Sequence, residues 1–597
     1  MVPSIRDYLE IRTARPSGFS PSGERVLVGA DLSGTVQLYE VPRAGGDLRR
    51  LTDLPEPVAG RYLPDCDDVL LSFDEGGDER LRIHRLVAGS GELCPVVSDP
   101  GHIARAGGVS RDGRLLAYTS NRRTGADFDV WVRDLRTGRE RMVFSPGGWC
   151  SAGAFSPDGR RLSVTRLSER PGDDDAYLVA VETGEVVHVS PHDDDAHFSG
   201  ASWLPDGRAF FFTTNHGREH TAVARYDLDA ASWSYVLHRP WDLGCAVDWA
   251  GRSLLVVANE DGTSRAELVD PSTLEVRTEV PLPGRGVAGS WSFSADGRFL
   301  AYAFASACEP GDAWCYDVET GATTRLTDCP KPVPPASMVE PELHRYRSFD
   351  GEEVPVFAYL PPSPPAVPPP VVAVLHGGPE GQFVRGFNPV VQYLVARGYA
   401  VVAPNVRGST GYGRRWEHLD DGRRRLDAVR DLEGLSDWLR SSSCFDADRA
   451  VLYGGSYGGY LVLAGLAFQP DRWAAGVSIV GISSLVTFLE GTAEWRRRFR
   501  EREYGSLATD RDFLLRASPL TSVEAVRAPL FLIHGANDPR VPLGEAQQIH
   551  RVLQAKGVPS ELALYPDEGH GLGKLANRLD AYPRAVDFLD RVLAARG

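Results

Sequence analysis

The stretch Val451-Leu-Tyr-Gly-Gly-Ser456-Tyr-Gly-Gly-Tyr460 decides the fold. It predicts an apolar strand, a glycine-lined turn and a helix that begins at Leu461 and runs to Phe468. A serine at the centre of Gly-x-Ser-x-Gly fits a nucleophile elbow, because so tight a turn leaves no room for side chains two residues away. Its hydroxyl then lies at a helix N-terminus, where the amides favour a developing anion. The motif also occurs by chance, so Ser456 is a candidate nucleophile that the surrounding order has to support.

Apolar strands alternate with helical segments on both sides of this stretch. Such alternation is typical of a mostly parallel sheet that helices cover. The eight predicted strands are His344–Phe349, Val354–Leu360, Val371–His376, Ala400–Pro404, Ala450–Gly454, Gly476–Val480, Leu530–His534 and Glu561–Tyr565. Together they predict an α/β-hydrolase domain.

A serine nucleophile needs a base that an acid holds in place, and the chain order in this fold is Ser, Asp, His. Asp538 follows the apolar strand that ends at His534, so a loop at the carboxyl edge of the sheet would present it. His570 follows the last predicted strand, whereas His534 precedes the acid and His550 lies in a helical stretch. We therefore predict a catalytic triad of Ser456, Asp538 and His570.

The tetrahedral intermediate of such a reaction needs hydrogen-bond donors for its oxyanion. One predicted donor is the backbone N–H of Tyr457, and the other is Gly378, in the glycine pair after the third strand. His376 is expected to orient that loop. We expect no metal, because no ligand-type cluster is present. We expect no cofactor either, because Gly408-Ser-Thr-Gly-Tyr-Gly413 lacks the Lys-Ser/Thr of a phosphate loop.

The first half of the chain repeats a short motif: an aromatic or apolar residue, a small residue and a turn that often reads Asp-Gly-Arg. The seven copies begin at Phe19, Tyr62, Val109, Phe155, Trp203, Trp249 and Phe293, at steps of 43 to 48 residues. Asp-Gly and Thr-Gly between short strands are typical of hairpins. A period of this length, with about four strands per unit, predicts a seven-bladed β-propeller. The alternative, an array of β-sandwiches, would not keep so constant a step.

The composition changes at Pro330-Lys-Pro-Val-Pro-Pro335, which has the character of an extended linker. We predict an N-terminal extension (residues 1–14) that packs on the hydrolase, a seven-bladed β-propeller (15–330) and an α/β-hydrolase catalytic domain (331–597). A chain of 597 residues exceeds the size at which one core keeps growing, which agrees with more than one domain.

The charge balance argues against a nucleic-acid partner. Asp and Glu outnumber Lys and Arg by 81 to 65, for a formal net charge of −16, and phosphate binding needs a basic face. We expect the run Arg496-Arg-Arg-Phe-Arg500 to be a solvated helix face. No segment has the apolar length of a signal peptide or a membrane span, so we expect no membrane partner and a cytoplasmic location. The oligomeric state stays open, with a homo-oligomer as one alternative.

Taken together, six motifs resemble the prolyl oligopeptidase family of serine peptidases, and within it the acylaminoacyl-peptidase-like branch. They are His376-Gly-Gly-Pro379, Asn405-Val-Arg-Gly-Ser-Thr-Gly-Tyr-Gly413, Gly454-Gly-Ser-Tyr-Gly-Gly459, Ser518-Pro-Leu520, His534-Gly-Ala-Asn-Asp-Pro-Arg-Val-Pro542 and Glu568-Gly-His-Gly571. The resemblance covers nearly the whole chain, although Val406 stands where such relatives often have proline. It implies hydrolysis of short or acylated peptides near one end, with the propeller restricting access to a cavity between the domains.

Three functional interpretations remain open. A serine peptidase of the oligopeptidase or acylaminoacyl peptidase type is favoured. An esterase, thioesterase or amide hydrolase of a specialised pathway would use the same triad on a small acyl substrate. A non-enzymatic propeller scaffold is disfavoured, because all three triad residues are present. The propeller shows no clear acidic pair of the kind that dipeptidyl peptidases of this family use to hold a free amino terminus.

Arg540 lies two residues after Asp538, on a loop that must pass close to the triad. We predict that it binds substrate, because its paired donors match a peptide's polar groups or a terminal carboxylate. The alternative is a surface arginine paired with a carboxylate, which contributes little to stability.

Overall fold

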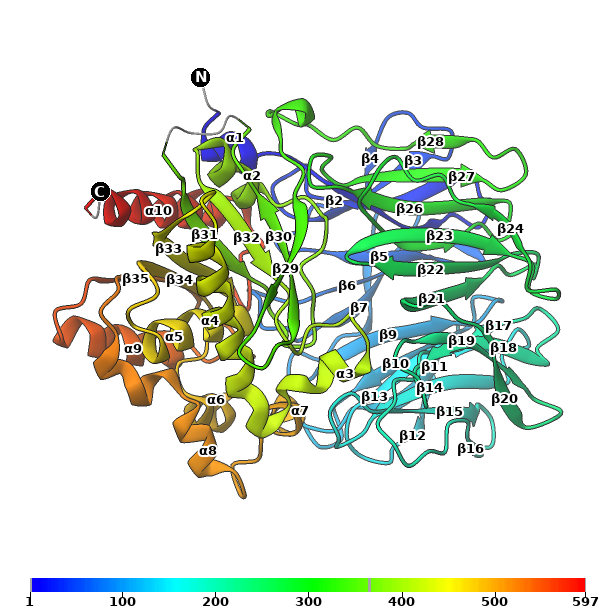
Figure 1. Cartoon of the computed structure of the whole chain (residues 1–597). Coiled ribbons are helices and arrows are strands. Elements are labelled where there is room, and N and C mark those ends of the chain that lie inside the picture. Colours follow the sequence, from blue (N-terminus) through cyan, green and yellow to red (C-terminus); the bar gives the residue numbers. More distant parts are fainter. Residues whose placement is uncertain (1–2, 363–366, 596–597) are drawn as a thin grey trace.

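The computed structural model describes residues 3–362 and 367–595 (Figure 1). Within these ranges the chain forms seven four-stranded sheets and one eight-stranded sheet that helices cover on both faces. The four-stranded sheets stand side by side as the blades of a propeller, and the eight-stranded sheet lies against one end of the ring. This architecture confirms the predicted seven-bladed β-propeller followed by an α/β-hydrolase domain.

Each blade is an antiparallel sheet whose strands are neighbours in the sequence as well as in space. Blades one to seven consist, in order, of β1 (Ala14–Phe19), β2 (Arg25–Ala30), β3 (Gln37–Pro42), β4 (Arg49–Arg50); β5 (Ala59–Leu63), β6 (Cys66–Phe73), β7 (Arg82–Leu86), β8 (Leu93–Val97); β9 (Ala104–Val109), β10 (Leu115–Ser120), β11 (Asp129–Asp134), β12 (Glu140–Phe144); β13 (Cys150–Phe155), β14 (Arg161–Leu167), β15 (Asp174–Ala180), β16 (Val186–His188); β17 (Ser202–Trp203), β18 (Ala209–Thr214), β19 (Ala222–Asp227), β20 (Ser232–Leu237); β21 (Asp242–Val247), β22 (Leu254–Glu260), β23 (Thr263–Val269), β24 (Val276–Glu279); β25 (Val287–Phe293), β26 (Phe299–Ala305), β27 (Asp312–Asp317), β28 (Thr323–Arg325). The repeated Asp-Gly turn joins the first two strands of a blade, and Gly159 adopts a φ of 71° there, as such a turn requires.

The ring closes through side chains. Every blade is continuous in the sequence, so among the described residues no strand from one end of the chain completes a blade at the other end. Instead Val26 and Val41 of blade one share a buried core with Ala301 and Leu326 of blade seven. Apolar packing between neighbouring blades therefore holds the first and last blades together.

The hydrolase sheet has the order β29-β30-β32-β31-β33-β34-β35-β36. Its strands are β29 (Glu342–Arg347), β30 (Glu353–Tyr359), β31 (Pro370–Leu375), β32 (Ala400–Pro404), β33 (Asp446–Gly455), β34 (Ala475–Ile479), β35 (Leu530–Gly535) and β36 (Ser560–Tyr565). The pairs β29–β30 and β30–β32 are antiparallel, and every later pair is parallel. All eight predicted strands are present, with ends that differ by a few residues.

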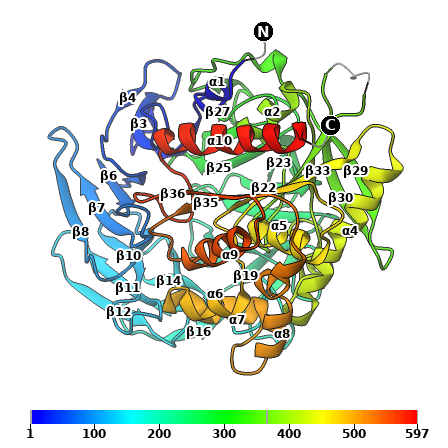
Figure 2. The ribbon, with the colours of Figure 1, turned by 90° about the vertical axis from the view of Figure 1, so that its left-hand side faces the viewer.

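Helices cover both faces of this sheet. They are α1 (Ile5–Leu9), α2 (Pro389–Ala396), α3 (Arg414–Glu417), α4 (Arg425–Ser441), α5 (Tyr457–Phe468), α6 (Leu485–Gly491), α7 (Glu494–Tyr504), α8 (Arg511–Arg516), α9 (Gly544–Ala555) and α10 (Leu575–Ala594). Successive residues of a strand point to opposite faces. Val371 accordingly packs in the core under α4, α5 and α9, whereas Val372 packs under α2 and α10. Figure 2 shows α10 crossing the sheet beside α1 and α2.

The N-terminal helix α1 lies on the hydrolase and not on the propeller. Its Tyr8 ring packs edge-on against Tyr393 of α2, with ring centroids 5.7 Å apart. The linker after blade seven is also held in place, because Lys331 Nζ lies 2.7 Å from Asp312 Oδ2 and Val333 is buried. We propose, as the sequence indicates, that the extension ends near residue 14 and that the two domains divide near residue 330.

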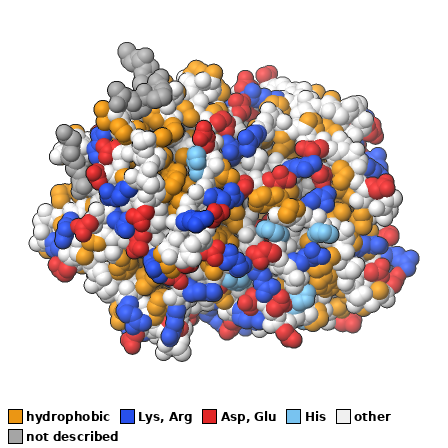
Figure 3. Space-filling model, in the orientation of Figure 1, with side chains coloured by type: hydrophobic (Ala, Val, Ile, Leu, Met, Phe, Trp, Pro, Cys, Tyr) orange, Lys and Arg blue, Asp and Glu red, His pale blue; other side chains and the backbone are white. Residues whose placement is uncertain are grey.

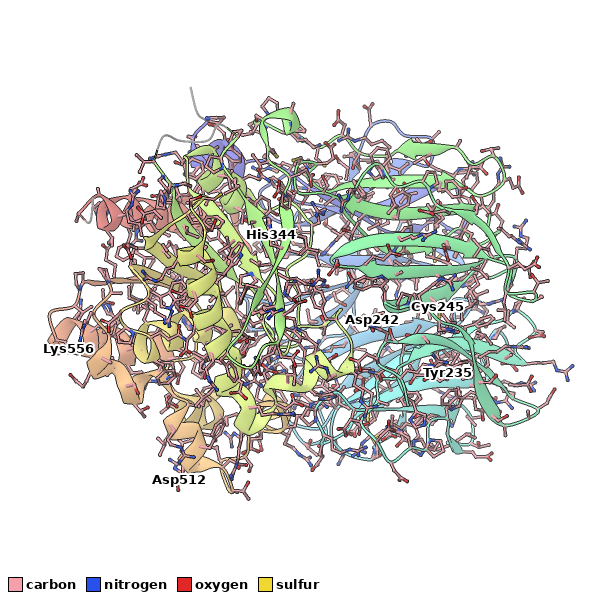
Figure 4. The ribbon with its side chains drawn as sticks, viewed as in Figure 1. Tyr235, Asp242, Cys245, His344, Asp512 and Lys556 are labelled. Carbon is pink, nitrogen blue, oxygen red and sulfur yellow. The ribbon has the colours of Figure 1, made fainter. Side chains whose placement is uncertain are left out.

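The outer surface carries charges of both signs. Acidic and basic side chains alternate over the face in Figure 3. The exposed Asp512 and the partly exposed Lys556 lie on the side of the hydrolase away from the propeller (Figure 4). Among the described residues, no helix combines the length and the apolar character that crossing a membrane requires.

Candidate active site

Ser456 lies at the turn between β33 and α5. Its backbone has φ 57° and ψ −119°, a strained combination for a residue other than glycine. The glycines of the motif permit this turn: a Cβ at Gly454 would lie 2.5 Å from the carbonyl oxygen of Gly458, and one at Gly458 would lie 2.1 Å from that of Leu375. The hydroxyl is therefore presented at the N-terminus of α5 at the carboxyl edge of the sheet.

The structure brings the three predicted triad residues into one chain of hydrogen bonds. Ser456 Oγ lies 2.9 Å from His570 Nε2, and His570 Nδ1 lies 2.7 Å from Asp538 Oδ2. The other oxygen of Asp538 accepts hydrogen bonds from the N–H groups of Arg540 (2.8 Å) and Val541 (3.0 Å). Both carboxylate oxygens of Asp538 thus accept hydrogen bonds, and these bonds fix the carboxylate in an orientation that can hold a catalytic base in place.

His534, the other histidine beside Asp538, occupies a structural position. It is fully buried, and its Nε2–H donates to the carbonyl oxygen of Val541 at 3.0 Å. Burial lowers its pKa, although the charge of Asp538 opposes the effect. His534 therefore supports the loop, and His570 is the histidine that contacts the serine.

The loop after β31 lies against Ser456. A Cβ at Gly377 would lie 3.4 Å from Ser456 Cβ, and His376 Nε2 lies 2.8 Å from Ser409 Oγ. Within the described part of the chain, the N–H groups of Gly378 and Tyr457 make no turn or side-chain hydrogen bond. Their role as oxyanion donors remains our prediction, and both groups are free for it.

A buried charge cluster that sequence reading missed supports Tyr457. Its hydroxyl donates to Asp420 Oδ2 at 3.0 Å, and the fully buried Arg425 pairs with both Asp420 and Glu503. Oxygens of Asp420, Asp421 and Glu503 lie within 4.8 Å of one another, as they could around a cation. Arg425 already supplies positive charge there, so we interpret the cluster as a buried ion-pair network that supports Tyr457. The only sequence signal is the run Asp420-Asp-Gly-Arg-Arg-Arg425, in which two acids precede three arginines.

The loop between β6 and β7 in blade two reaches the loops that carry Asp538 and His570. Glu79 pairs with Arg540 Nε, and the backbone carbonyl of Gly76 accepts a hydrogen bond from Asn537 Nδ2 at 2.8 Å. Gly77 lies so close to the hydrolase that a Cβ there would be 2.3 Å from the nitrogen of Gly569, the residue before His570. Arg540 is thus bound to the propeller through one side of its guanidinium.

A second contact between the domains lies at His197, in the connection between β16 of blade four and β17 of blade five. Its ring nitrogens lie 3.0 Å from Asp174 and 3.0 Å from Glu417 of the hydrolase. Burial alone would lower the pKa of His197, but these two carboxylates outweigh it and raise the pKa to about 11. The charged histidine therefore bridges the two domains.

The expectation for the arginine run 496–500 is wrong in part. Arg498 is 59% exposed on the outer side of α7 and pairs with Glu169. Arg496 and Arg500 are only partly exposed, and the Nε atom of each is buried. The sequence predicts a solvated helix face because it shows the spacing of a helix but not what the inner face of that helix packs against.

Known proteins of similar sequence are peptidases. A family model described as the prolyl oligopeptidase family matches residues 385–596. Dipeptidyl aminopeptidase BIII of Pseudoxanthomonas mexicana is 28% identical over 97% of this chain and 86% of its own length. The acylamino-acid-releasing enzyme of Homo sapiens is 27% identical over 58% of this chain and 49% of its own. The solved structure of a Mycobacterium tuberculosis puromycin-hydrolyzing peptidase has a TM-score of 0.87 at 21% identity, over 99% of this chain and 96% of that one, and shows the fold.

Proposed function

Because the chain belongs to the prolyl oligopeptidase family of serine peptidases, we propose that it hydrolyses short peptides through an acyl-enzyme on Ser456, with Asp538 and His570 completing the triad. The observation that carries this proposal is the unbroken hydrogen-bond chain from Ser456 Oγ through His570 to Asp538. A strained serine at a helix N-terminus with a base in contact is the arrangement that acyl transfer needs.

In the acylation step, Ser456 Oγ attacks the carbonyl carbon of the scissile amide while His570 Nε2 takes the hydroxyl proton. The negative charge moves to the carbonyl oxygen, where the N–H groups of Tyr457 and Gly378 stabilise it. Asp538 stabilises the imidazolium through Nδ1–H. The imidazolium then gives its proton to the leaving nitrogen, the C–N bond breaks, and an ester to Ser456 remains.

In the deacylation step, a water molecule replaces the departed amine. His570 takes one proton from the water, whose oxygen attacks the ester carbonyl, and the same two N–H groups hold the second oxyanion. The proton returns to Ser456 Oγ as the ester bond breaks. The products are a carboxylic acid and an amine, and the enzyme is regenerated.

The propeller is proposed to limit the size of the substrate. Contacts at Gly77 and Glu79 in blade two, and at His197 between blades four and five, hold it against the hydrolase domain. Peptides would then reach Ser456 only through openings that exclude a folded protein. Arg540 is proposed to orient the peptide with its terminal guanidinium nitrogens, since only Nε makes a side-chain hydrogen bond among the described residues.

Substrate profiling tests this proposal. The purified protein should hydrolyse blocked and free aminoacyl amides and tripeptides, and it should leave folded proteins and most sites of denatured casein uncut. A preference for short acyl esters or thioesters, with no cleavage of amides, would instead support the specialised-pathway hydrolase. Cleavage of casein along its whole length as readily as of a tripeptide would refute the size limit.

A further inference from the structure

The inward face of α7 carries two arginines that no carboxylate pairs with. Arg496 and Arg500 are four residues apart, so their side chains lie one turn apart on the same face of the helix. Among the described residues, neither forms an ion pair within 4.0 Å, and the Nε of each is buried without a hydrogen-bond partner. Arg498 on the outer face differs, because it pairs with Glu169.

One end of this face is attached to the loop that carries the triad acid. Just before α7 begins, the Thr492 hydroxyl donates to the carbonyl oxygen of Arg540 at 2.8 Å. The next residue, Ala493, donates its N–H to the carbonyl oxygen of Pro539 at 3.1 Å. Arg496 follows within one turn of this attachment, which fixes its position relative to the triad.

The electrostatics agree with that placement. Burial and the like charges of Arg500 and Arg540 lower the pKa of Arg496 to about 9, while Glu79 and Asp538 oppose the shift. Each of these opposing carboxylates already has a partner, since Glu79 pairs with Arg540 and Asp538 with His570. Arg496 is therefore close to the triad without being neutralised by it.

The other end of the face approaches the loop of the predicted oxyanion donor Gly378. Glu380 follows that loop, and burial together with Glu503 raises the pKa of Glu380 to about 7, while Arg502 and Arg500 oppose this. Glu503 is itself paired with Arg425. Arg496 thus lies toward the loop that carries Asp538, and Arg500 lies toward the loop that carries Gly378 and Glu380.

A third arginine approaches from the propeller. Arg105 on β9 also has a buried Nε without a partner in the described chain, and its guanidinium lies 5.2 Å from the centre of the Trp149 ring. Trp149 packs on Phe499 of α7, with ring centroids 4.9 Å apart. Arg105 also lines a cavity of 680 Å³ formed mainly by first strands of blades one to four and seven, so this cavity lies at the centre of the ring.

Buried positive charge without a partner is costly, and an anionic ligand would remove that cost. We propose that Arg496 and Arg500, with Arg105 opposite, form a subsite that binds a carboxylate of the substrate next to the scissile bond. This inference rests on the proposed peptidase function. Peptides offer a carboxylate in two forms, an acidic side chain and a free C-terminus, and both suit the paired donors of a guanidinium.

The test uses the full-length protein and tetrapeptides that carry Glu or Gln at each position in turn, each made with a free and an amidated C-terminus. We expect the wild-type enzyme to cleave the carboxylate-bearing member of a pair with a kcat/KM at least about tenfold higher, as a charge-assisted hydrogen bond implies. The Arg496→Gln and Arg500→Gln variants should bring that ratio close to one. The matched control Arg498→Gln changes an exposed arginine of the same helix and should keep the wild-type ratio.

The pattern of preference identifies the source of the carboxylate. A ratio that follows the position of Glu assigns the subsite to an acidic side chain, and a ratio that follows the free C-terminus assigns it to the terminal carboxylate. Equal rates within each pair for the wild-type enzyme, or an equal loss of the ratio in Arg498→Gln, would overturn the inference while leaving peptide hydrolysis intact.

If no peptide is cleaved, the proposed function fails, and inhibition of short-ester hydrolysis still tests the subsite. N-acetylglutamate should then inhibit the wild-type enzyme at least about tenfold more strongly than N-acetylglutamine amide, which carries no carboxylate, and Arg496→Gln should abolish the difference. Equal inhibition by the two compounds would refute the carboxylate subsite.

Discussion

Replacing Gly77 with alanine should disturb His570, the proposed catalytic base, across the domain interface. The new Cβ would lie 2.3 Å from the nitrogen of Gly569, and real Cβ contacts almost never fall below 3.0 Å. Backbone atoms cannot rotate away as a side chain can, so one of the two loops must shift. Gly569 directly precedes His570, and a displacement of about 1 Å near the reacting groups can cost about a hundredfold in rate.

We therefore expect Gly77→Ala to lower kcat/KM for a short peptide by about ten- to a hundredfold. Alanine at a φ of 77° also carries strain of about 1 kcal/mol, so the control must share that strain. Gly89→Ala provides it, because Gly89 has a φ of 85° in the same blade and nothing within 4 Å of an added Cβ. Kinetic constants and Tm are measured for both variants. Equal activities for Gly77→Ala and Gly89→Ala would refute the claim that blade two positions the His570 loop.

Three further predictions concern charged residues. The pKa of His197 is raised to about 11 in the folded state, so the charged histidine stabilises the fold fully below about pH 6.5 and less as the pH rises toward 11. The Tm of His197→Gln should therefore lie below that of the wild type by an amount that shrinks from pH 6 to 9.5. A difference in Tm that stays constant over this range would contradict the bridge. Arg425→Met leaves Asp420 and Glu503 unpaired and should destabilise the hydrolase domain by about 3–5 kcal/mol in denaturant unfolding, whereas the exposed Arg424→Met should cost little. Arg540→Ala should lower kcat/KM for peptides about tenfold and spare short acyl esters; an equal loss on both would assign Arg540 to support of Asp538.

Sequence alone could predict the two domains, the eight hydrolase strands and the spacing of the blades. Each of these depends on local periodicity or on turn chemistry that repeats. The turn around Ser456 is of the same kind, because its glycines are required within two residues of the serine. The loop positions of Asp538 and His570 followed from the strand order, and their hydrogen-bond contact agrees with the roles we propose.

Sequence could not reveal the contacts between the domains. Gly77 and Gly569 are far apart in the chain, and nothing in either local sequence indicates that two backbones meet there. The same holds for Arg496: its spacing from Arg500 predicts one helix face, but only the packing of α7 against blades three and four turns that face inward. Burial across an interface depends on the assembled domains, so a run of arginines reads as solvated until the structure places it.

Covalent labelling by a fluorophosphonate, followed by peptide mapping, tests the central claim most directly. The reagent reacts with a serine that a neighbouring base activates, so we expect one labelled peptide containing Ser456 and a complete loss of peptide hydrolysis in proportion to labelling. Ser456→Ala should fold normally and take up no label. Full hydrolysis by Ser456→Ala, or label on another serine together with loss of activity, would contradict the account.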